Sequence, residues 1–291
     1  MHHAAGSPVG RTFLITGVSS GLGRAFAVEA LQAGHRVVGT VRDADQVAAF
    51  NELAPGQSSA MLLDVTDDIA ALALVDAVER DIGPIDVLVS NAGYGVEGTV
   101  EESSMGDLRR QFDVNVYGTV AVVKAVLPYM RRRRGGHIFT VSSMAGQTAL
   151  PGIAFYCASK FAIEGFSDSL AQEVAGFGIH VTCLALGGFR TDWAGRSMTR
   201  VVRTISDYDD VFDSIRAGRQ AKHGNQPGDP ARAARALLQV LRAENPPVHL
   251  VLGSDALHLI ERGRERSQKE LAAWEPLTIS TDFPKTPDTL I

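Results

Sequence analysis

Short apolar segments alternate with longer segments of helical periodicity along most of the chain. The short segments have the length of buried strands, and the longer ones have the length of helices. The pattern predicts seven strands, at Thr12–Ile15, Arg36–Val41, Ser59–Leu63, Asp86–Val89, His137–Val141, His180–Ala185 and Val248–Leu252. It predicts helices near Leu22–Ala33, Asp67–Arg80, Met105–Arg132 and Ala154–Ala175.

This alternation is typical of an α/β fold, because successive parallel strands need right-handed crossover connections. We therefore predict a doubly wound parallel sheet of about seven strands with helices on both faces. Two predicted helix ends carry the expected stop signals, Gly34 after one helix and Gly83-Pro84 after another.

The alternation breaks in the polar segment 187–228, which is rich in Arg, Asp, Ser and Gly. We interpret this segment as a mobile lid with short helices rather than as a separate domain. The next helix starts at Asp229-Pro230, and residues from about 255 to 291 are expected to form a charged helix and a Pro/Thr-rich, disordered tail. A single domain is predicted over residues 11–291, after a flexible N-terminus at residues 1–10.

The composition is that of an ordinary folded protein, with 45% hydrophobic residues, 21% charged residues and a net charge of −5. This balance gives no reason to expect nucleic acid or an anionic membrane as a partner, and the basic run at 131–134 is interpreted as a solvated helix end. No run of about 18 uncharged apolar residues occurs, so no membrane span is expected. Cys157 and Cys183 lack metal-binding or redox spacing, which predicts no metal site and a cytoplasmic location.

A glycine-rich loop follows the first predicted strand directly and leads into a helix. Glycines let the backbone turn sharply and approach a pyrophosphate, and the helix N-terminus supplies N–H groups and positive dipole to that anion. The alternative is a plain glycine-rich turn, but the position of the loop favours a dinucleotide site in a Rossmann-type fold. The G-x-x-x-G-x-G spacing assigns the cofactor contacts to Gly17, Ser19, Ser20, Gly21, Leu22 and Gly23.

The end of the second predicted strand indicates which dinucleotide binds. It reads Val41-Arg42, with no acid to bind a ribose 2′-hydroxyl and with a guanidinium that suits a 2′-phosphate. We therefore favour NADP(H) over NAD(H), although Arg42 could also be a surface arginine. Two further loops at strand ends are ordinary turn sequences that we also assign to the cofactor, Asp64-Val65 for the adenine amine and Asn91-Ala92-Gly93 for the riboses.

Tyr156 and Lys160 are four residues apart, which places them on the same face of a predicted helix. The charge of the lysine is expected to favour tyrosinate and to lower the pKa of the phenol from about 10. A phenol that donates and accepts a proton suits the interconversion of a ketone and a secondary alcohol. Because this spacing also occurs by chance, its significance depends on the nucleotide site.

Together, these segments resemble the short-chain dehydrogenase/reductase family, in its compact single-domain branch, over roughly residues 11–252. The amino-acid sequences of residues 156–162 and 187–192 especially resemble those of hydroxysteroid and retinol dehydrogenases. The resemblance implies a catalytic tetrad, and the family's serine-to-tyrosine interval favours Ser143 over Ser142. The four residues would be Asn115, Ser143, Tyr156 and Lys160.

Each member of the tetrad has an implied role. Tyr156 would exchange a proton with the substrate oxygen, and Ser143 would hydrogen-bond the same oxygen. Lys160 would bind the nicotinamide ribose and lower the pKa of Tyr156, and Asn115 would hold a water that links Lys160 to a proton relay. Judged without the resemblance, Asn115 could be a polar residue inside a helix and either serine a strand-end cap.

The chain departs from the family pattern at Leu186-Gly187, where the family usually has Pro-Gly after the sixth strand. Proline would fix the entry to the loop over the nicotinamide, so Leu186 is expected to leave that loop less constrained. Gly187 and Thr191 are still assigned to the cofactor. The substrate is expected to meet apolar residues near the tetrad and in the lid, which favours a lipophilic ketone or aldehyde; we assign Met144, Leu150, Phe155 and Phe189.

The resemblance thus implies an NADP(H)-dependent oxidoreductase that acts on CH–OH donors and their carbonyl counterparts. A catalytically silent NAD(P)-binding sensor or scaffold is the alternative, but such proteins commonly lack the tyrosine or the lysine. An epimerase or dehydratase of the extended branch shares Tyr-x-x-x-Lys, and the glycine spacing and shorter C-terminal region argue against it. The resemblance also implies a homodimer or homotetramer, paired through helices near Met105–Arg132 and Ala154–Ala175.

Overall fold

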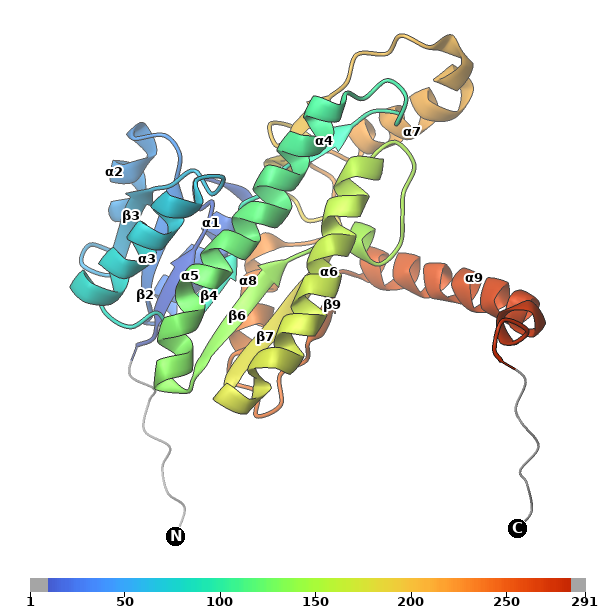
Figure 1. Cartoon of the computed structure of the whole chain (residues 1–291). Coiled ribbons are helices and arrows are strands. Elements are labelled where there is room, and N and C mark those ends of the chain that lie inside the picture. The colour runs from blue at the N-terminus through green and yellow to red at the C-terminus, as the bar shows by residue number, and fades with distance from the viewer. Residues whose placement is uncertain (1–9, 284–291) are drawn as a thin grey trace, which may run out of the picture.

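The computed structural model describes residues 10–283 and is built around seven parallel strands (Figure 1). The strands are β1 (Thr12–Ile15), β2 (Arg36–Val41), β3 (Ser58–Leu62), β4 (Val87–Ser90), β6 (Gly136–Val141), β7 (Ile179–Leu186) and β9 (His249–Leu252). They form one sheet in the order β3-β2-β1-β4-β6-β7-β9. The predicted Rossmann-type α/β fold is confirmed, and each predicted strand end lies within one residue of its observed position.

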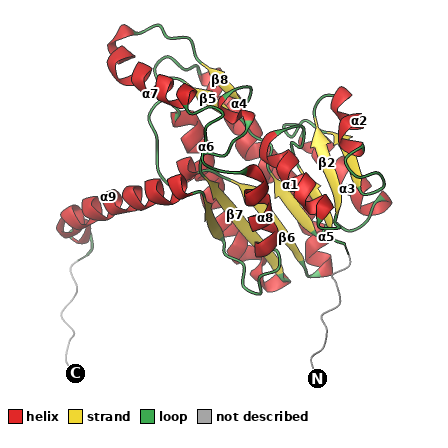
Figure 2. Ribbon diagram, turned by 180° about the vertical axis from the view of Figure 1, so that it is seen from behind, coloured by secondary structure: helices red, strands yellow, loops and turns green. Residues whose placement is uncertain are grey.

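Helices cover both faces of the sheet (Figures 1 and 2). On one face α1 (Gly21–Gln32) packs against α8 (Pro230–Val240), and on the other lie α3 (Asp68–Asp81), α5 (Gly118–Arg133) and α6 (Ala154–Val174). β1 shows why both faces are apolar, because Phe13 and Ile15 enter the first core whereas Leu14 enters the second. Successive side chains of a strand point to opposite faces, so a strand covered on both sides is apolar throughout.

β1 marks the point where the strand order reverses, with β2 on one side and β4 on the other. In such sheets, ligands bind in the crevice outside the carboxyl ends of the strands at this switch point. The glycine-rich loop follows β1 here, and the loops after β2, β3 and β4 reach the same edge of the sheet. The topology therefore gathers the loops that the sequence assigned to the cofactor.

The helix expected over Met105–Arg132 is not one regular helix. It consists of α4 (Met105–Phe112), a π-helical turn at Asp113–Tyr117, and α5. Ser104 starts α4 with a capping box, because its side chain accepts from Asp107 N–H while Asp107 accepts from the Ser104 backbone. The chain stays helical throughout, and the wider turn falls on the segment that contains Asn115.

Three helices or strands of the described residues were not indicated by the pattern, namely α2 (Asp45–Asn51), β5 (Gly95–Glu97) and β8 (Met198–Arg200). The segment 187–228, where short helices were expected, contains α7 (Asp209–Ala221). β5 and β8 pair in parallel as a separate two-stranded sheet, so the segment 187–228 is joined by backbone hydrogen bonds to the chain that follows β4. This segment lies beyond the carboxyl end of the main sheet, together with α4 and α7 (Figure 2).

The last described helix, α9 (Ser254–Ile279), extends away from the sheet (Figures 1 and 2). Its first turns are anchored, since Ala256 and Ile260 are buried, whereas its distal half exposes Leu271 and Trp274. This confirms the charged helix; residues 1–9 and the end of the predicted tail, 284–291, lie outside the described residues. Among residues 10–283 no helix has the length and apolar character that a bilayer crossing requires.

Candidate active site

The glycine-rich loop has the backbone geometry that a phosphate site needs. Gly17 and Gly21 adopt positive φ angles of 71° and 59°, where other residues are strained. A side chain at Gly23 would collide with the carbonyl oxygen of Gly17, so this position requires glycine. Ser20 precedes α1 without capping it through its side chain, which leaves the first amides of the helix to a ligand or to water.

Asn91 holds this loop in place from the end of β4. Its Nδ2 donates to the carbonyl oxygens of Thr16 (2.9 Å) and Gly17 (3.1 Å). The hydroxyl of Thr16 in turn accepts from the N–H groups of Asn91 and Ala92, each at 2.9 Å. The side chain of Asn91 therefore holds the glycine loop against the end of β4.

Arg42 and Asp64 lie at neighbouring strand ends and are both exposed. Hydrogen bonds from the N–H and hydroxyl of Thr66, followed by the charge of Arg42, hold the pKa of Asp64 below its usual value. One carboxylate oxygen of Asp64 is thus occupied by Thr66. Val65 is buried against Gly118, where a side chain would come within 2.7 Å of Val65 Cγ2, so its side chain supports the loop from the core.

Tyr156 and Ser143 face each other at the carboxyl edge of the sheet. Tyr156 on α6 is only 6% exposed, and a hydrogen bond with the Ser143 side chain acts on its phenol. The neighbouring serine points elsewhere, since Ser142 Oγ lies 3.5 Å from the backbone oxygen of Lys160. Between the two candidate serines, only Ser143 therefore meets the tyrosine.

Lys160 is buried beneath this pair. Its Nζ donates to the carbonyl oxygen of Val141 (2.8 Å) and lies 5.7 Å from the centroid of the Tyr156 ring. Burial lowers the pKa of Lys160 to about 8 and raises the pKa of Tyr156 above its ordinary value. The expected net lowering of the phenol pKa is therefore wrong for the protein without bound nucleotide, because the cost of burial exceeds any effect of the lysine charge.

Asn115 is buried in the π-helical turn and bonded on all sides. Its Nδ2 donates to Tyr94 O (3.0 Å) and Ser159 Oγ (3.1 Å), and its Oδ1 accepts from Tyr94 N–H (3.1 Å). A side chain at Gly93 would lie 3.1 Å from Asn115 Oδ1 and 3.7 Å from Lys160 Nζ. Gly93 thus keeps the space between these two polar groups free of protein atoms.

The loop after β7 is held despite the missing proline. Leu186 is 4% exposed and packs into the core as the last residue of β7, so the strand itself directs the chain. Gly188 N–H donates to Asp255 Oδ2 (2.7 Å) at the start of α9, and a side chain at Gly187 would collide with the same carboxylate. Thr191 lies over Gly21 of the glycine loop. The sequence reading missed Asp255, which anchors the loop from 67 residues away.

The four residues assigned to the substrate lie in different surroundings. Leu150 packs with the cluster around Tyr156, whereas Met144 packs toward α9, and Phe155 is half-buried in the first turn of α6. Phe189 does not face the tyrosine, because it is 8% exposed in the core beneath α1 and α8. Trp193, which the sequence reading missed, is the residue of this segment that covers the site, with its ring centroid 5.1 Å from that of Tyr156.

Comparisons with known proteins define the class. The family model described as short chain dehydrogenase matches residues 11–201, so the chain belongs to the short-chain dehydrogenase/reductase family. Retinol dehydrogenase 8 of Bos taurus is 35% identical over an alignment of 258 residues, which covers 82% of this chain and 80% of that protein. A short-chain dehydrogenase structure from Streptomyces avermitilis is 36% identical with a TM-score of 0.89, covering 94% of this chain and 99% of the other.

A solved structure with cofactor also resembles this chain. The structure of ElxO with NADP bound is 25% identical with a TM-score of 0.69, and the match covers 84% of this chain and 96% of that one. The glycine geometry and the uncapped start of α1 fit such a dinucleotide. The protein is therefore an NAD(P)-binding oxidoreductase of this family.

Proposed function

We propose that the protein interconverts a lipophilic ketone or aldehyde and its alcohol with NADP(H) as the cofactor. The observation that carries the proposal is the convergence of Ser143 and buried Tyr156 above Lys160, beside the glycine loop. A phenol and a serine hydroxyl that face the same space can both hydrogen-bond one oxygen atom, as a carbonyl reduction requires.

The nicotinamide of NADP(H), when bound, supplies or accepts the hydride. Tyr156 gives its proton to the carbonyl oxygen in reduction, and burial keeps the phenol protonated for that step at neutral pH. Ser143 hydrogen-bonds the same oxygen and stabilises its developing charge. The ammonium of Lys160 lies close enough to stabilise the tyrosinate that remains.

We propose that the space kept open by Gly93 holds the water of the proton relay. It lies between Asn115 Oδ1 and Lys160 Nζ, so a water there has an acceptor and a donor within reach. Asn115 itself is fixed by Tyr94 and Ser159 and is suited to position a water rather than to move. In this role Asn115 and Gly93 act through Lys160.

The remaining cofactor and substrate contacts follow from the same edge of the sheet. We propose that Arg42 binds the 2′-phosphate and that the segment 187–228, within one domain at 11–291, closes over the nicotinamide and substrate. Trp193 and Leu150 give the space beside Tyr156 an apolar lining, which supports a lipophilic substrate. We further propose a homodimer or homotetramer in the cytoplasm, where two free cysteines are compatible with a reducing environment.

The test is Tyr156→Phe, measured as NADPH oxidation against a panel of ketones, aldehydes and diketones. Loss of the proton donor is expected to lower turnover by about 100-fold or more, while the NADPH dissociation constant changes little. The matched control is Tyr129→Phe, because the Tyr129 hydroxyl donates to Asp76 on α3 and not to any group of the site, so its loss should leave turnover unchanged. Full turnover in Tyr156→Phe would exclude the mechanism, and NADPH binding without turnover on any substrate would favour the sensor alternative.

A further inference from the structure

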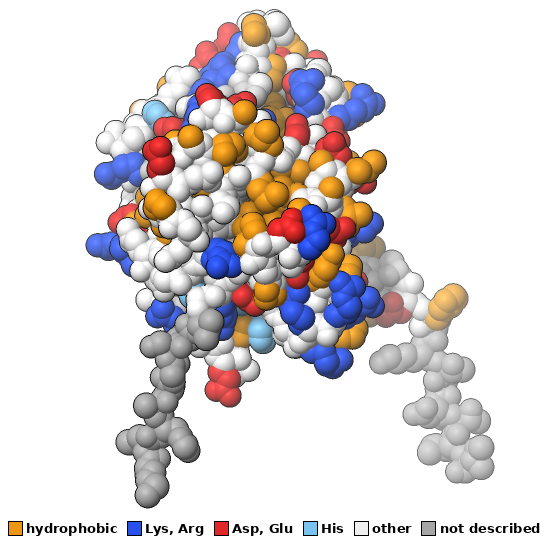
Figure 3. All heavy atoms as spheres, turned by 90° about the vertical axis from the view of Figure 1, so that its left-hand side faces the viewer, with side chains coloured by type: hydrophobic (Ala, Val, Ile, Leu, Met, Phe, Trp, Pro, Cys, Tyr) orange, Lys and Arg blue, Asp and Glu red, His pale blue; other side chains and the backbone are white. Residues whose placement is uncertain are grey.

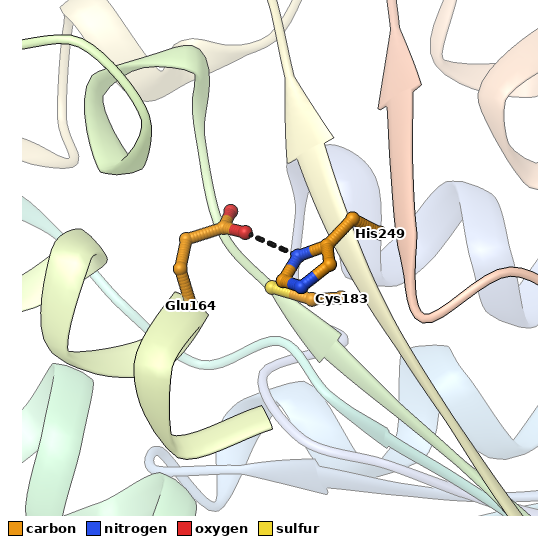
Figure 4. Close-up of side chains that lie close together, drawn as sticks. All are labelled: Glu164, Cys183 and His249. Atoms are coloured by element: carbon orange, nitrogen blue, oxygen red, sulfur yellow. Dashed lines mark hydrogen bonds and ion pairs between the residues drawn. The ribbon is translucent and has the colours of Figure 1, made fainter. Parts of the chain in front are cut away.

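Cys183 and His249 lie side by side on the face of the sheet that α6 covers. They are register partners in the adjacent parallel strands β7 and β9, so their side chains leave the sheet in the same direction. Glu164 on α6 reaches the same point from above (Figure 4). One ligand atom from each of the three residues lies within 4.8 Å of the others.

The carboxylate of Glu164 is incompletely satisfied. Its Oε2 accepts from Gln147 Nε2 (3.3 Å) and pairs with His249 Nδ1 (2.8 Å), whereas its Oε1 is buried and has no hydrogen-bond partner. Glu164 as a whole is only 7% exposed. A buried carboxylate oxygen without a partner is costly and indicates a group that completes it, such as an ion.

A second layer of polar groups orients the ligands. The far ring nitrogen of His249, Nε2, lies 3.5 Å from Asp168 Oδ1, one turn further along α6. A carboxylate on the outer nitrogen is the usual partner of a metal-bound histidine, because it fixes the ring orientation and the tautomer. Thr140 and Ser167 hydrogen-bond each other at 2.7 Å, and the thiol of Cys183 faces Thr140, Ser167 and Glu164.

We propose that Glu164, Cys183 and His249 form a zinc site, with water as the fourth ligand. Thiolate, imidazole and carboxylate are all zinc donors, whereas calcium and magnesium prefer oxygen alone. Zinc bonds of about 2.0–2.3 Å in a tetrahedron hold donor atoms roughly 3.3–3.6 Å apart. His249 Nδ1 lies 2.8 Å from Glu164 Oε2, which is closer than this spacing, so the ring would have to move slightly outward to bind the ion; its side chain is 36% exposed on the edge strand β9.

Binding replaces the proton of the Cys183 thiol, which is released to solvent, and no electron is transferred. The positive charge of the ion offsets the cost of burying a thiolate. The ion would join α6, β7 and the edge strand β9. The site is independent of the proposed oxidoreductase function.

Cobalt(II) is the spectroscopic probe for this site in the full-length protein, after metal has been removed with a chelator. We expect visible bands of a tetrahedral ion and a thiolate-to-cobalt charge-transfer band, both displaced by one equivalent of Zn²⁺. Cys183→Ser should abolish the charge-transfer band, and His249→Gln should weaken Zn²⁺ binding at least tenfold. Asp168→Asn should weaken binding by about 10–100-fold, because it removes the carboxylate charge beside the outer nitrogen of His249.

Two control variants separate this site from other donors. Cys157→Ser should keep the charge-transfer band, and replacement of both His2 and His3 by Ala should leave binding unchanged. No charge-transfer band in the wild type, or a band that survives Cys183→Ser, would overturn the proposal. If Cys183→Ser does not fold, thermal unfolding tests the proposal instead. Zn²⁺ should raise the Tm of the wild type but not that of His249→Gln. An equal rise of Tm in both proteins would overturn the proposed zinc site.

Discussion

Tyr156 and Lys160 show what can be predicted at the scale of single residues. Their helical spacing and the choice of Ser143 were readable from the sequence, since both depend on short intervals along the chain. The burial of Tyr156 was not, because it depends on Leu150 and Trp193, which pack against it from other segments. The direction of the Tyr156 pKa was therefore mispredicted, as were the surroundings of Phe189.

Burial of Lys160 has a measurable effect on stability. Its pKa is about 8 in the folded protein, against an ordinary value of 10.5, so below pH 8 the buried charge destabilises the fold. Lys160→Met should raise the unfolding free energy by up to about 3 kcal/mol at pH 7. The gain is reduced by the free energy of the hydrogen bond to Val141 that the variant loses. As pH rises from 8 toward 10.5, the native protein gives up its proton first and this advantage should shrink.

Denaturant unfolding of the nucleotide-free protein at pH 7, 9 and 10 measures this effect. Lys124→Met is the matched control, because Lys124 is exposed on α5 and should show no such trend. A difference between Lys160→Met and the wild type that stays constant over this range would contradict the burial argument. The same variant should lose activity, as stability and function compete at this position.

Arg42 determines the choice of cofactor in our proposal. Arg42→Ala should raise the NADPH dissociation constant by about 10–100-fold, as expected for the loss of a charge-assisted hydrogen bond, and should change that of NADH little. Fluorescence titration with each nucleotide measures both values. Arg80→Ala is the control, since Arg80 is exposed and pairs with Asp81; equal effects of Arg42→Ala on the two nucleotides would exclude a 2′-phosphate contact.

At the scale of elements, periodicity predicted the strands and long helices of the main sheet, but not the two short strands that join the segment 187–228 to the rest of the fold. β5 and β8 are three residues each, too short for a pattern, and they are held by charges about 100 residues apart in sequence. Buried Glu97 pairs with Arg200 (3.0 Å) and Arg219 (2.9 Å). Glu102 accepts from Thr204 and Ile205 N–H and from Arg203, which lowers its pKa to about 2.

If the segment 187–228 is the lid that we propose, Glu97 should control how often it opens. Glu97→Gln removes the charge that faces Arg200 and Arg219 while it keeps the size of the side chain. We expect amide hydrogen exchange in residues 198–221 to become at least about 10-fold faster and the KM for substrate to rise. Glu52→Gln, an exposed glutamate outside the lid, is the control; unchanged exchange in Glu97→Gln would show that these ion pairs do not hold the segment.

At the scale of the whole molecule, some features depend on contacts between segments far apart in the sequence, and the sequence pattern does not indicate them. The proposed zinc ligands Glu164 and His249 are 85 residues apart, so no local spacing marks them, and the sequence reading predicted no metal. The charged C-terminal helix was predicted, but its projection from the body was not (Figure 1). On the face that carries α2 and α3, hydrophobic, acidic and basic side chains are interspersed without a patch of one charge (Figure 3).

Two exposed aromatic residues mark the surface through which we expect subunits to pair. Phe161 on α6 is 45% exposed and Tyr117, just before α5, is 62% exposed, so both helices present an aromatic ring to solvent. Pairing of these helices between subunits would bury both rings. We expect sedimentation equilibrium to give the mass of two or four chains, and Phe161→Glu to shift it toward one, because a buried unpaired carboxylate is costly. Ile69→Glu is the control, since Ile69 on α3 is 77% exposed outside the proposed interface. A monomeric wild type would contradict the proposed assembly. Loss of assembly in Ile69→Glu but not in Phe161→Glu would place the interface on another surface.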